Sequence, residues 1–217
     1  MNRLKIINGI GITMVMLTLC CTTPKSKGTN TLPLPVSSSN DQDTATFGAG
    51  CFWCIETQFA MLKGVESVES GYSGGHIAHP TYSQVSRGNT GHAEVVNIVF
   101  NPQVISFDEL LQVFFLLHDP TQLNRQGNDV GTQYRSAIFV HTQEQLTKST
   151  HYIQKLRDAN IYDKEIVTEV TPFTAFYKAE DHHQQYYLNN GEEPYCRIVI
   201  TPKMEKFKKV FADKLKK

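Results

Sequence analysis

The stretch Gly48-Ala49-Gly50-Cys51-Phe52-Trp53-Cys54-Ile55-Glu56 joins a short β-prone run at residues 44–47 to an amphipathic segment. Apolar residues recur at helical spacing from Cys51 until Lys63-Gly64 ends the pattern. The pattern predicts a strand at 44–48, a turn of small residues and a helix at 51–62. Cys51 is therefore expected in the first turn of that helix.

A thiol at the start of a helix is expected to be reactive. The first N–H groups of a helix lack partners and carry partial positive charge, which lowers the pKa of a nearby thiol. The small residues before Cys51 leave the sulfur open, and Phe52 and Trp53 place two rings beside it. Cys54 follows three residues later on nearly the same helix face, close enough for a disulfide. The stretch indicates redox chemistry at Cys51.

The first residues have the features of a secretory signal. Arg3 and Lys5 precede an apolar run of about 14 residues, shorter than a membrane span needs. We expect a signal peptide at 1–20 and a flexible linker at 21–43, which is rich in Ser, Thr, Pro and Asn. The stretch 17–21 resembles a bacterial lipobox, with Cys20 or Cys21 as the lipidated residue; an ordinary cleaved signal is the alternative. Both place the protein in the cell envelope or periplasm.

The remaining chain, residues 44–217, has the length of one catalytic domain. The full chain carries 21 basic and 21 acidic residues, so nothing suggests a nucleic-acid surface. Outside the leader only Cys51, Cys54 and Cys196 remain, too few for a disulfide scaffold. The histidines do not have zinc-type spacing, so no metal is expected.

The apolar patterns predict alternating strands and helices. Strands are expected at 44–48, 65–72, 92–100, 135–141, 165–170 and 196–200, and helices at 51–62, 106–118, 143–158, 179–189 and from 203, with a short helical turn around Tyr82. The order β-α-β-β-α-β through residue 141 is that of a ferredoxin-like plait. We therefore predict an α+β fold, a two-layer sandwich with a ferredoxin-like core and C-terminal additions, in which helices pack on one face of a mostly antiparallel sheet.

Glu94 is the candidate general acid. On a strand at 92–100 it shares one face with apolar residues, and burial disfavours the ionised carboxylate and raises its pKa. A solvated position at the strand's edge is the alternative. Two long polar loops, 71–91 and 119–133, carry or adjoin Tyr82 and Tyr134, whose hydroxyls suit an oxygen that gains negative charge.

A series of motifs then runs in order along residues 44–200. It comprises Gly50-Cys51-Phe52-Trp53, Gly71-Tyr72-Ser73-Gly74-Gly75, Pro80-Thr81-Tyr82, Gly91-His92-Ala93-Glu94, His118-Asp119-Pro120-Thr121, Gln126-Gly127-Asn128-Asp129-Val130-Gly131, Gln133-Tyr134-Arg135-Ser136 and Ala179-Glu180-Asp181-His182-His183-Gln184. In this series the chain resembles peptide methionine sulfoxide reductase of the A type.

The resemblance implies that Cys51 attacks the sulfoxide sulfur and Glu94 helps to protonate the oxygen. It implies substrate-binding roles for Phe52, Trp53, Tyr82, Asp129 and Tyr134. The family reduces the S epimer, free or in proteins, and one enzyme class serves each epimer. Cys51 becomes a sulfenic acid, a second cysteine forms a disulfide with it, and an external thioredoxin-like dithiol reduces that disulfide. No bound cofactor is implied, and we expect a monomer that meets a membrane only through a lipid at Cys20 or Cys21.

Many family members have glycine at the position of Cys54 and use cysteines in a C-terminal tail. Disulfide geometry favours Cys54 as the resolving cysteine, with Cys196 as the alternative. A thioredoxin-like disulfide oxidoreductase and an inactive, lipid-anchored binding module are the rival classes. Neither would require Glu94 and the two tyrosines together.

Overall fold

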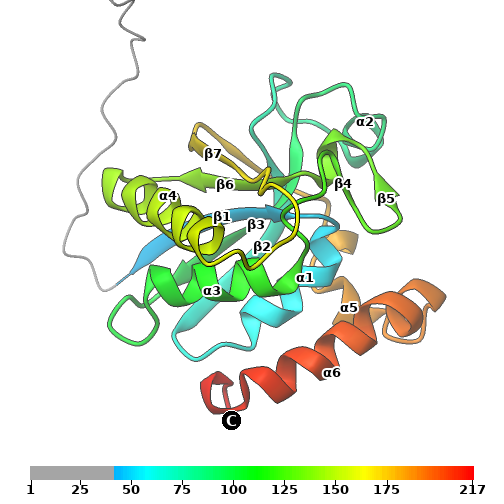
Figure 1. The fold of residues 1–217 in the computed structure, drawn as a ribbon. Coiled ribbons are helices and arrows are strands. Elements are labelled where there is room, and N and C mark those ends of the chain that lie inside the picture. The colour runs from blue at the N-terminus through cyan, green and yellow to red at the C-terminus, as the bar shows by residue number, and fades with distance from the viewer. Residues whose placement is uncertain (1–41) are drawn as a thin grey trace, which may run out of the picture. The chain divides into compact units, whose positions relative to one another are not determined.

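The computed structural model describes residues 42–217 (Figure 1). The predicted signal peptide at 1–20 and nearly all of the linker at 21–43, with Cys20 and Cys21, lie outside the described residues. Within residues 42–217, no helix combines the length and apolar character that crossing a bilayer requires.

A six-stranded sheet in the order β7-β6-β1-β3-β2-β8 forms the centre of this domain. Its strands are β1 (Asp43–Ala49), β2 (Val65–Ser73), β3 (Ala93–Phe100), β6 (Ser136–Val140), β7 (Glu169–Pro172) and β8 (Phe176–Lys178). All neighbours are antiparallel except β6 and β7, which are parallel. The middle order β6-β1-β3-β2 is the ferredoxin-like arrangement that the sequence predicts.

Three helices connect the strands of this core. Helices α1 (Phe52–Ala60) and α3 (Phe107–Leu117) cover one face of the sheet, and α4 (Gln143–Asp158) leads from β6 to β7 (Figure 1). Phe47 on β1 packs with Phe59 of α1 and with Phe107 and Phe114 of α3, at ring-centroid distances of 5.7, 5.9 and 5.0 Å. The buried rings hold α1 and α3 against β1.

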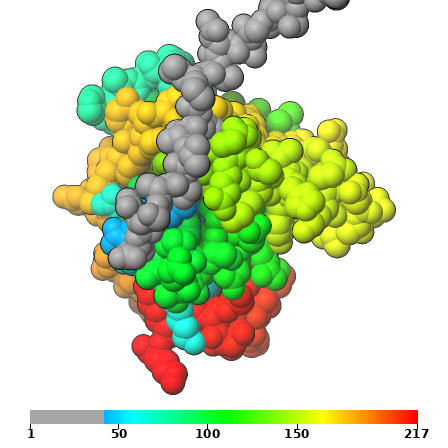
Figure 2. All heavy atoms as spheres, turned by 90° about the vertical axis from the view of Figure 1, so that its left-hand side faces the viewer, coloured from blue at the N-terminus to red at the C-terminus, as the bar shows by residue number. Residues whose placement is uncertain are grey.

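The chain beyond β7 adds short elements around α1. They are β8, a 3₁₀ turn at Asp181–His183, α5 (Tyr186–Asn189), a helical turn at Cys196–Ile200 and α6 (Thr201–Val210). Short elements also interrupt the loops: α2 (Tyr82–Val85), and the hairpin of β4 (Arg125–Gln126) and β5 (Asp129–Val130), which precedes a 3₁₀ turn at Thr132–Tyr134. A last 3₁₀ turn spans Ala212–Lys214. Figure 2 shows α3, in green, above α6, in red, on one surface of the domain.

The predicted elements of the core agree with the structure within about two residues, but the C-terminal prediction needs correction. Residues 196–200 form a helical turn that leads into α6, not a strand. Cys196 and Ile200 are fully buried whereas Ile198 is 74% exposed, which is the spacing of a helix face. The helix predicted at 179–189 is two short pieces, because Gln185 between them is left-handed at φ 52°. The sequence also missed β8 and the β4-β5 hairpin, and the strand predicted at 165–170 lies instead at Glu169–Pro172.

Candidate active site

The turn before Cys51 depends on glycine. Gly50 has φ +92°, and a Cβ there would lie 2.7 Å from the Cβ of Gln126. Cys51 itself is the N-cap of α1, one residue before the first turn in which the sequence places it, and its carbonyl accepts a hydrogen bond from Cys54 N–H at 3.0 Å. Cys51 is buried, with 8% of its surface exposed. The thiol is thus fixed at the open end of the helix.

Glu94 points from β3 toward this helix start. It is 1% exposed, and its Oε2 accepts a hydrogen bond from the N–H of Phe52 at 3.1 Å. Burial raises the pKa of Glu94 to about 8, although the hydrogen bond from Phe52 opposes the shift. The carboxyl group therefore carries its proton at neutral pH, and its hydrogen-bond partner Phe52 directly follows Cys51 in the chain. The alternative of a solvated Glu94 is wrong.

The two thiols of α1 are both free and act on each other. The hydrogen bond between the two thiols lowers the pKa of Cys54 to about 7. The same bond raises the pKa of Cys51, and burial and the nearby charges of Cys54 and Glu94 add to the rise. The prediction that the helix start lowers the pKa of Cys51 is wrong for the resting pair. Cys54 is therefore the more acidic thiol of the pair. As a thiolate it can accept the Cys51 proton through the hydrogen bond between them.

An aromatic wall stands beside the thiols. Trp53 stacks on Tyr186 with ring centroids 3.7 Å apart and planes within 9°, and its Nε1 donates to Nδ1 of His183 at 3.2 Å. Phe52 is fully buried and lies against the same histidine at 5.4 Å. The sequence predicts the Phe52-Trp53 pair but not Tyr186 or His183, which come from a segment about 130 residues away.

Tyr82 and Tyr134 lie near enough to Glu94 to feel its charge. Both are partly buried. Burial raises the pKa of Tyr82 to about 12 and also raises that of Tyr134, and the negative charge of an ionised Glu94 would add to each shift. Both hydroxyls therefore remain protonated donors. Glu180 fixes the position of Tyr82, because its Oε1 accepts the Tyr82 N–H at 2.8 Å and its Oε2 accepts the Tyr72 hydroxyl at 3.0 Å.

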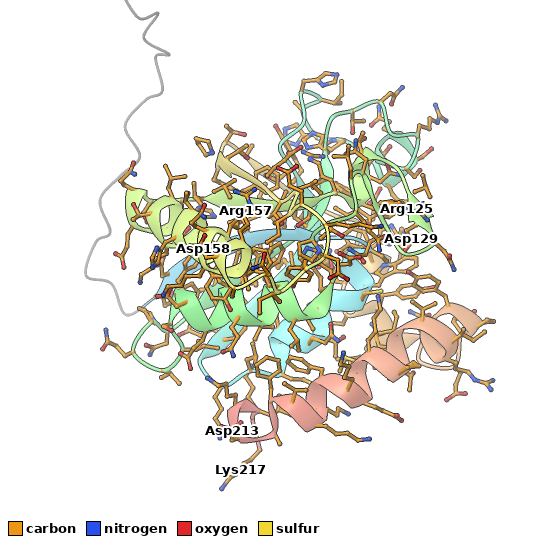
Figure 3. All side chains as sticks on the ribbon, in the orientation of Figure 1. Arg125, Asp129, Arg157, Asp158, Asp213 and Lys217 are labelled. Carbon is orange, nitrogen blue, oxygen red and sulfur yellow. The ribbon has the colours of Figure 1, made fainter. Side chains whose placement is uncertain are left out.

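Asp129 reaches the site through a tyrosine that the sequence analysis did not identify. The hydroxyl of Tyr195 donates to Oδ2 of Asp129 at 2.9 Å and lies 3.7 Å from the Sγ of Cys54. Figure 3 shows Asp129 beside Arg125 on the β4-β5 hairpin. Cys196, the next residue after Tyr195, is fully buried. Asp129 thus holds the Tyr195 hydroxyl beside the Cys54 thiol.

The structure brings together the predicted catalytic and substrate-binding groups from five segments of the chain. These groups are Cys51, Phe52, Trp53, Cys54, Tyr82, Glu94, Asp129 and Tyr134. Residues 42–217 contain no cluster of three or more His, Cys, Asp or Glu side chains placed to hold a metal ion. A thiol pair, a protonated carboxylic acid and neutral phenols around one helix start define a thiol-dependent reductase of a polar acceptor.

Comparison with known proteins identifies the acceptor. The family model for peptide methionine sulfoxide reductase matches residues 43–215. The peptide methionine sulfoxide reductases MsrA of Natronomonas pharaonis and Saccharolobus solfataricus are 51% and 52% identical over 172 and 174 residues, which cover 79% and 80% of this chain and 97% of each relative. The MsrA of Acinetobacter baumannii is 52% identical over 172 residues, 79% of this chain and 98% of the relative.

Solved structures agree with the sequence comparison. Methionine sulfoxide reductase A of Corynebacterium diphtheriae superposes with a TM-score of 0.63 at 38% identity, over 70% of this chain and 77% of that chain. Reduced Mxr1 from Saccharomyces cerevisiae superposes with a TM-score of 0.66 at 31% identity, over 73% and 91%. The chain belongs to the peptide methionine sulfoxide reductase family, MsrA type. It is a peptide-methionine (S)-S-oxide reductase, and neither a thioredoxin-like oxidoreductase nor an inactive binding module.

Proposed function

We propose that Cys51, Glu94 and Cys54 carry out the reduction of methionine S-sulfoxide to methionine in this chain. The buried Glu94 carboxyl, hydrogen-bonded to the N–H of Phe52, is the observation that carries the assignment. With a pKa of about 8 it is protonated at neutral pH, and it lies beside the start of α1, where Cys51 is the N-cap. A sulfoxide oxygen needs such a donor when its bond to sulfur breaks.

In the first step the substrate's methyl group packs against Phe52 and Trp53, and its oxygen faces Glu94, Tyr82 and Tyr134. Cys51 passes its proton to Cys54 and attacks the sulfoxide sulfur as a thiolate. Glu94 delivers a proton to the oxygen, while the neutral phenols stabilise the developing negative charge. The oxygen, with this proton, is transferred to Cys51, so methionine leaves and Cys51 remains as a sulfenic acid.

In the second step Cys54 attacks the sulfenic sulfur of Cys51. A disulfide forms between the two cysteines, and the oxygen leaves as water. Cys54 is the better placed resolving cysteine, because it shares a hydrogen bond with Cys51 while Cys196 is fully buried on another helical turn. An external thioredoxin-like dithiol then exchanges with the disulfide and restores both thiols, so the cycle needs no bound cofactor.

The test is a single-turnover assay with dithiothreitol-reduced protein, lacking residues 1–41, and each epimer of methionine sulfoxide. Methionine should form from the S epimer alone. Cys51→Ser should form none, whereas Cys54→Ser should complete one turnover and stop with a sulfenic acid at Cys51. Cys196→Ser is the matched control and should cycle like the wild type. A Cys196→Ser enzyme that stalls as a sulfenic acid would transfer the resolving role to Cys196.

We also propose that the chain acts as a monomer in the cell envelope, tethered through Cys20 or Cys21. The basic start, the short apolar run and the lipobox-like stretch at 17–21 support this location. In a bacterial host, fractionation of the full chain beside Cys20→Ala and Cys21→Ala variants tests it. Release of one variant from the membrane fraction identifies the lipidated cysteine. A wild-type chain that is wholly soluble after cleavage contradicts the lipid anchor, and a cytoplasmic, uncleaved chain contradicts the envelope location.

A further inference from the structure

A cleft of about 340 Å³ lies on α1 beyond the active site, bordered by the end of α3 and by α6. Gln58 lines it from α1, four residues after Cys54, and residues at that spacing share a helix face. Gln126 lines it from β4 and also packs against the turn at Gly50. Gln58 therefore places the edge of the cleft about one helical turn, 5.4 Å along α1, from Cys54.

Most polar groups of the lining already have partners within the domain. Both ring nitrogens of His118 are hydrogen-bonded, and burial lowers its pKa to about 4, so the ring is neutral. The side-chain amide of Gln126 accepts a hydrogen bond from the N–H of Asp119 and donates one to its carbonyl. The Asp119 carboxylate accepts bonds within its own turn, and the Tyr162 hydroxyl donates to a carbonyl. Gln58 is the exception: it is 1% exposed, and its Nε2 has no partner.

Two cations border the same cleft. Lys203 and Lys206 lie one turn apart on α6, and neither forms an ion pair with any of residues 42–217. The only carboxylate in the lining is Asp119. Buried Phe207 and the 42% exposed Leu116 supply an apolar surface. The unpaired Gln58 amide and the two lysines, beside this apolar surface, fit a carboxylate on a short aliphatic side chain.

We propose that this cleft is a substrate subsite that binds the side-chain carboxylate of an Asp or Glu residue close to the methionine sulfoxide in a polypeptide. The inference deepens the proposed function and rests on it. An extended chain advances about 3.3 to 3.6 Å per residue, so a residue about two positions from the methionine spans one helical turn of about 5.4 Å. The subsite gives acidic segments of oxidised proteins a higher kcat/KM than neutral segments.

Steady-state assays with dithiothreitol as the reductant test this proposal, because a small neutral reductant keeps protein docking out of the rate. The substrates are N-acetyl-methionine-S-sulfoxide amide and two matched series of peptides. One series carries Glu at a single position from three before to three after the sulfoxide, and the other carries Gln there. The wild type should show a kcat/KM about threefold higher for the best Glu peptide than for its Gln partner at low salt, and 0.5 M NaCl should abolish the difference.

Lys206→Glu should reverse the preference, so that the Gln peptide reacts faster, and should leave the small substrate unchanged. Lys208→Glu is the matched control, because it makes the same charge change at an exposed position of α6 outside the cleft. Gln58→Leu tests the buried donor, and a Gln58→Glu variant, which also changes the group's charge, should oppose the carboxylate. A thermal melt of each variant distinguishes a lost subsite from a lost fold.

Three results would overturn the proposal. Equal kcat/KM for every Glu and Gln pair with the wild type would exclude a carboxylate subsite. Equal effects of Lys206→Glu and Lys208→Glu would show that the preference comes from the net charge of α6 and not from the cleft. Unchanged peptide kinetics in Lys206→Glu, with slower recycling by a protein dithiol, would assign the cleft to the reductant. Failure of the wild type to reduce the small substrate would instead contradict the proposed function itself.

Discussion

Replacement of Glu94 by Gln removes the titratable carboxyl group but keeps the shape of the side chain. A carboxamide has nearly the same shape, and its oxygen can still accept the Phe52 N–H that Glu94 binds at 3.1 Å. The substitution removes only the ability to lose or donate a carboxyl proton. The change therefore probes the two properties that the structure gives Glu94, its burial and its protonated state.

The expected effect on stability follows from the pKa. The pKa of Glu94 rises from 4.5 to about 8 in the folded domain, chiefly through burial. Between these values the unfolded chain has released a proton that the folded domain still holds, so the contribution of Glu94 to stability is complete below about pH 4.5 and is lost as pH rises to about 8. At 1.36 kcal/mol per unit, the shift corresponds to about 5 kcal/mol. Glu94→Gln does not titrate and escapes this loss.

Urea unfolding at several pH values from 4.5 to 8.5 measures the difference in unfolding free energy between wild type and Glu94→Gln. That difference should move in favour of the variant by several kcal/mol as pH rises. Glu205→Gln, at an exposed position of α6, should show no such trend. A difference that stays constant across the range would refute the account, because it would mean that Glu94 has the same protonation state in the folded and unfolded chains.

Activity should change in the opposite sense. General acids contribute roughly 10²- to 10⁴-fold, so the single-turnover rate of Glu94→Gln at pH 7 should fall by at least about 100-fold. The wild-type rate should fall as pH rises through about 8, where Glu94 loses its proton, and the variant should lack this limb. A wild-type rate that keeps rising above pH 8 would show that a carboxyl proton at this position is not required.

Three further outcomes follow from the site. Gly50→Ala should lose about 1 to 3 kcal/mol of unfolding free energy, measured by urea titration, because φ is +92° and the new Cβ would lie 2.7 Å from a neighbouring side-chain carbon; wild-type stability would contradict this geometry. Tyr186→Leu should raise the KM for methionine sulfoxide about two- to tenfold by removing the ring stacked on Trp53 at 3.7 Å, whereas Tyr186→Phe should match the wild type; an equal rise in both would assign the effect to the hydroxyl. Cys51→Ala should move the thiolate absorbance of Cys54 from about pH 7 to higher pH by removing its hydrogen-bond partner, and an unmoved titration would show that the partner does not set the pKa.

The ferredoxin-like core could be predicted from the sequence because its elements have strong local patterns. Helix α4 lies at the predicted residues 143–158, with Thr142 as its N-cap. The alternation along β3 places Val96, Ile98 and Phe100 in the main core on the same face as Glu94. The burial that raises the pKa of Glu94 is therefore a consequence of strand periodicity, which a sequence displays directly.

The C-terminal segment could not be predicted in the same way. Cys196, Ile198 and Ile200 fit strand alternation, but Cys196 and Ile200 also have the i, i+4 spacing of a helix, and a run of five residues does not distinguish the two. Contacts with α1 and α6 decide the outcome. Tyr195 and His183 join the site only because this segment folds back onto α1, which no local pattern reveals.

The pKa values of the thiol pair were also beyond the sequence. The helix-start rule applies to an isolated thiol, and it predicts an acidic Cys51. In the folded domain the hydrogen bond between Cys51 and Cys54 outweighs that effect and places the acidity on Cys54. Spacing indicates that two thiols are close, but the direction of a shared hydrogen bond depends on burial and on neighbours such as Glu94.

Peptide mass mapping after one turnover tests the central claim most directly. Fully reduced protein is mixed with one equivalent of methionine-S-sulfoxide without external reductant, and free thiols are then alkylated. The account predicts one Cys51–Cys54 disulfide for each methionine formed, with Cys196 alkylated after unfolding. Methionine formation with a disulfide that contains Cys196, or with Cys51 still alkylated as a free thiol, would contradict it.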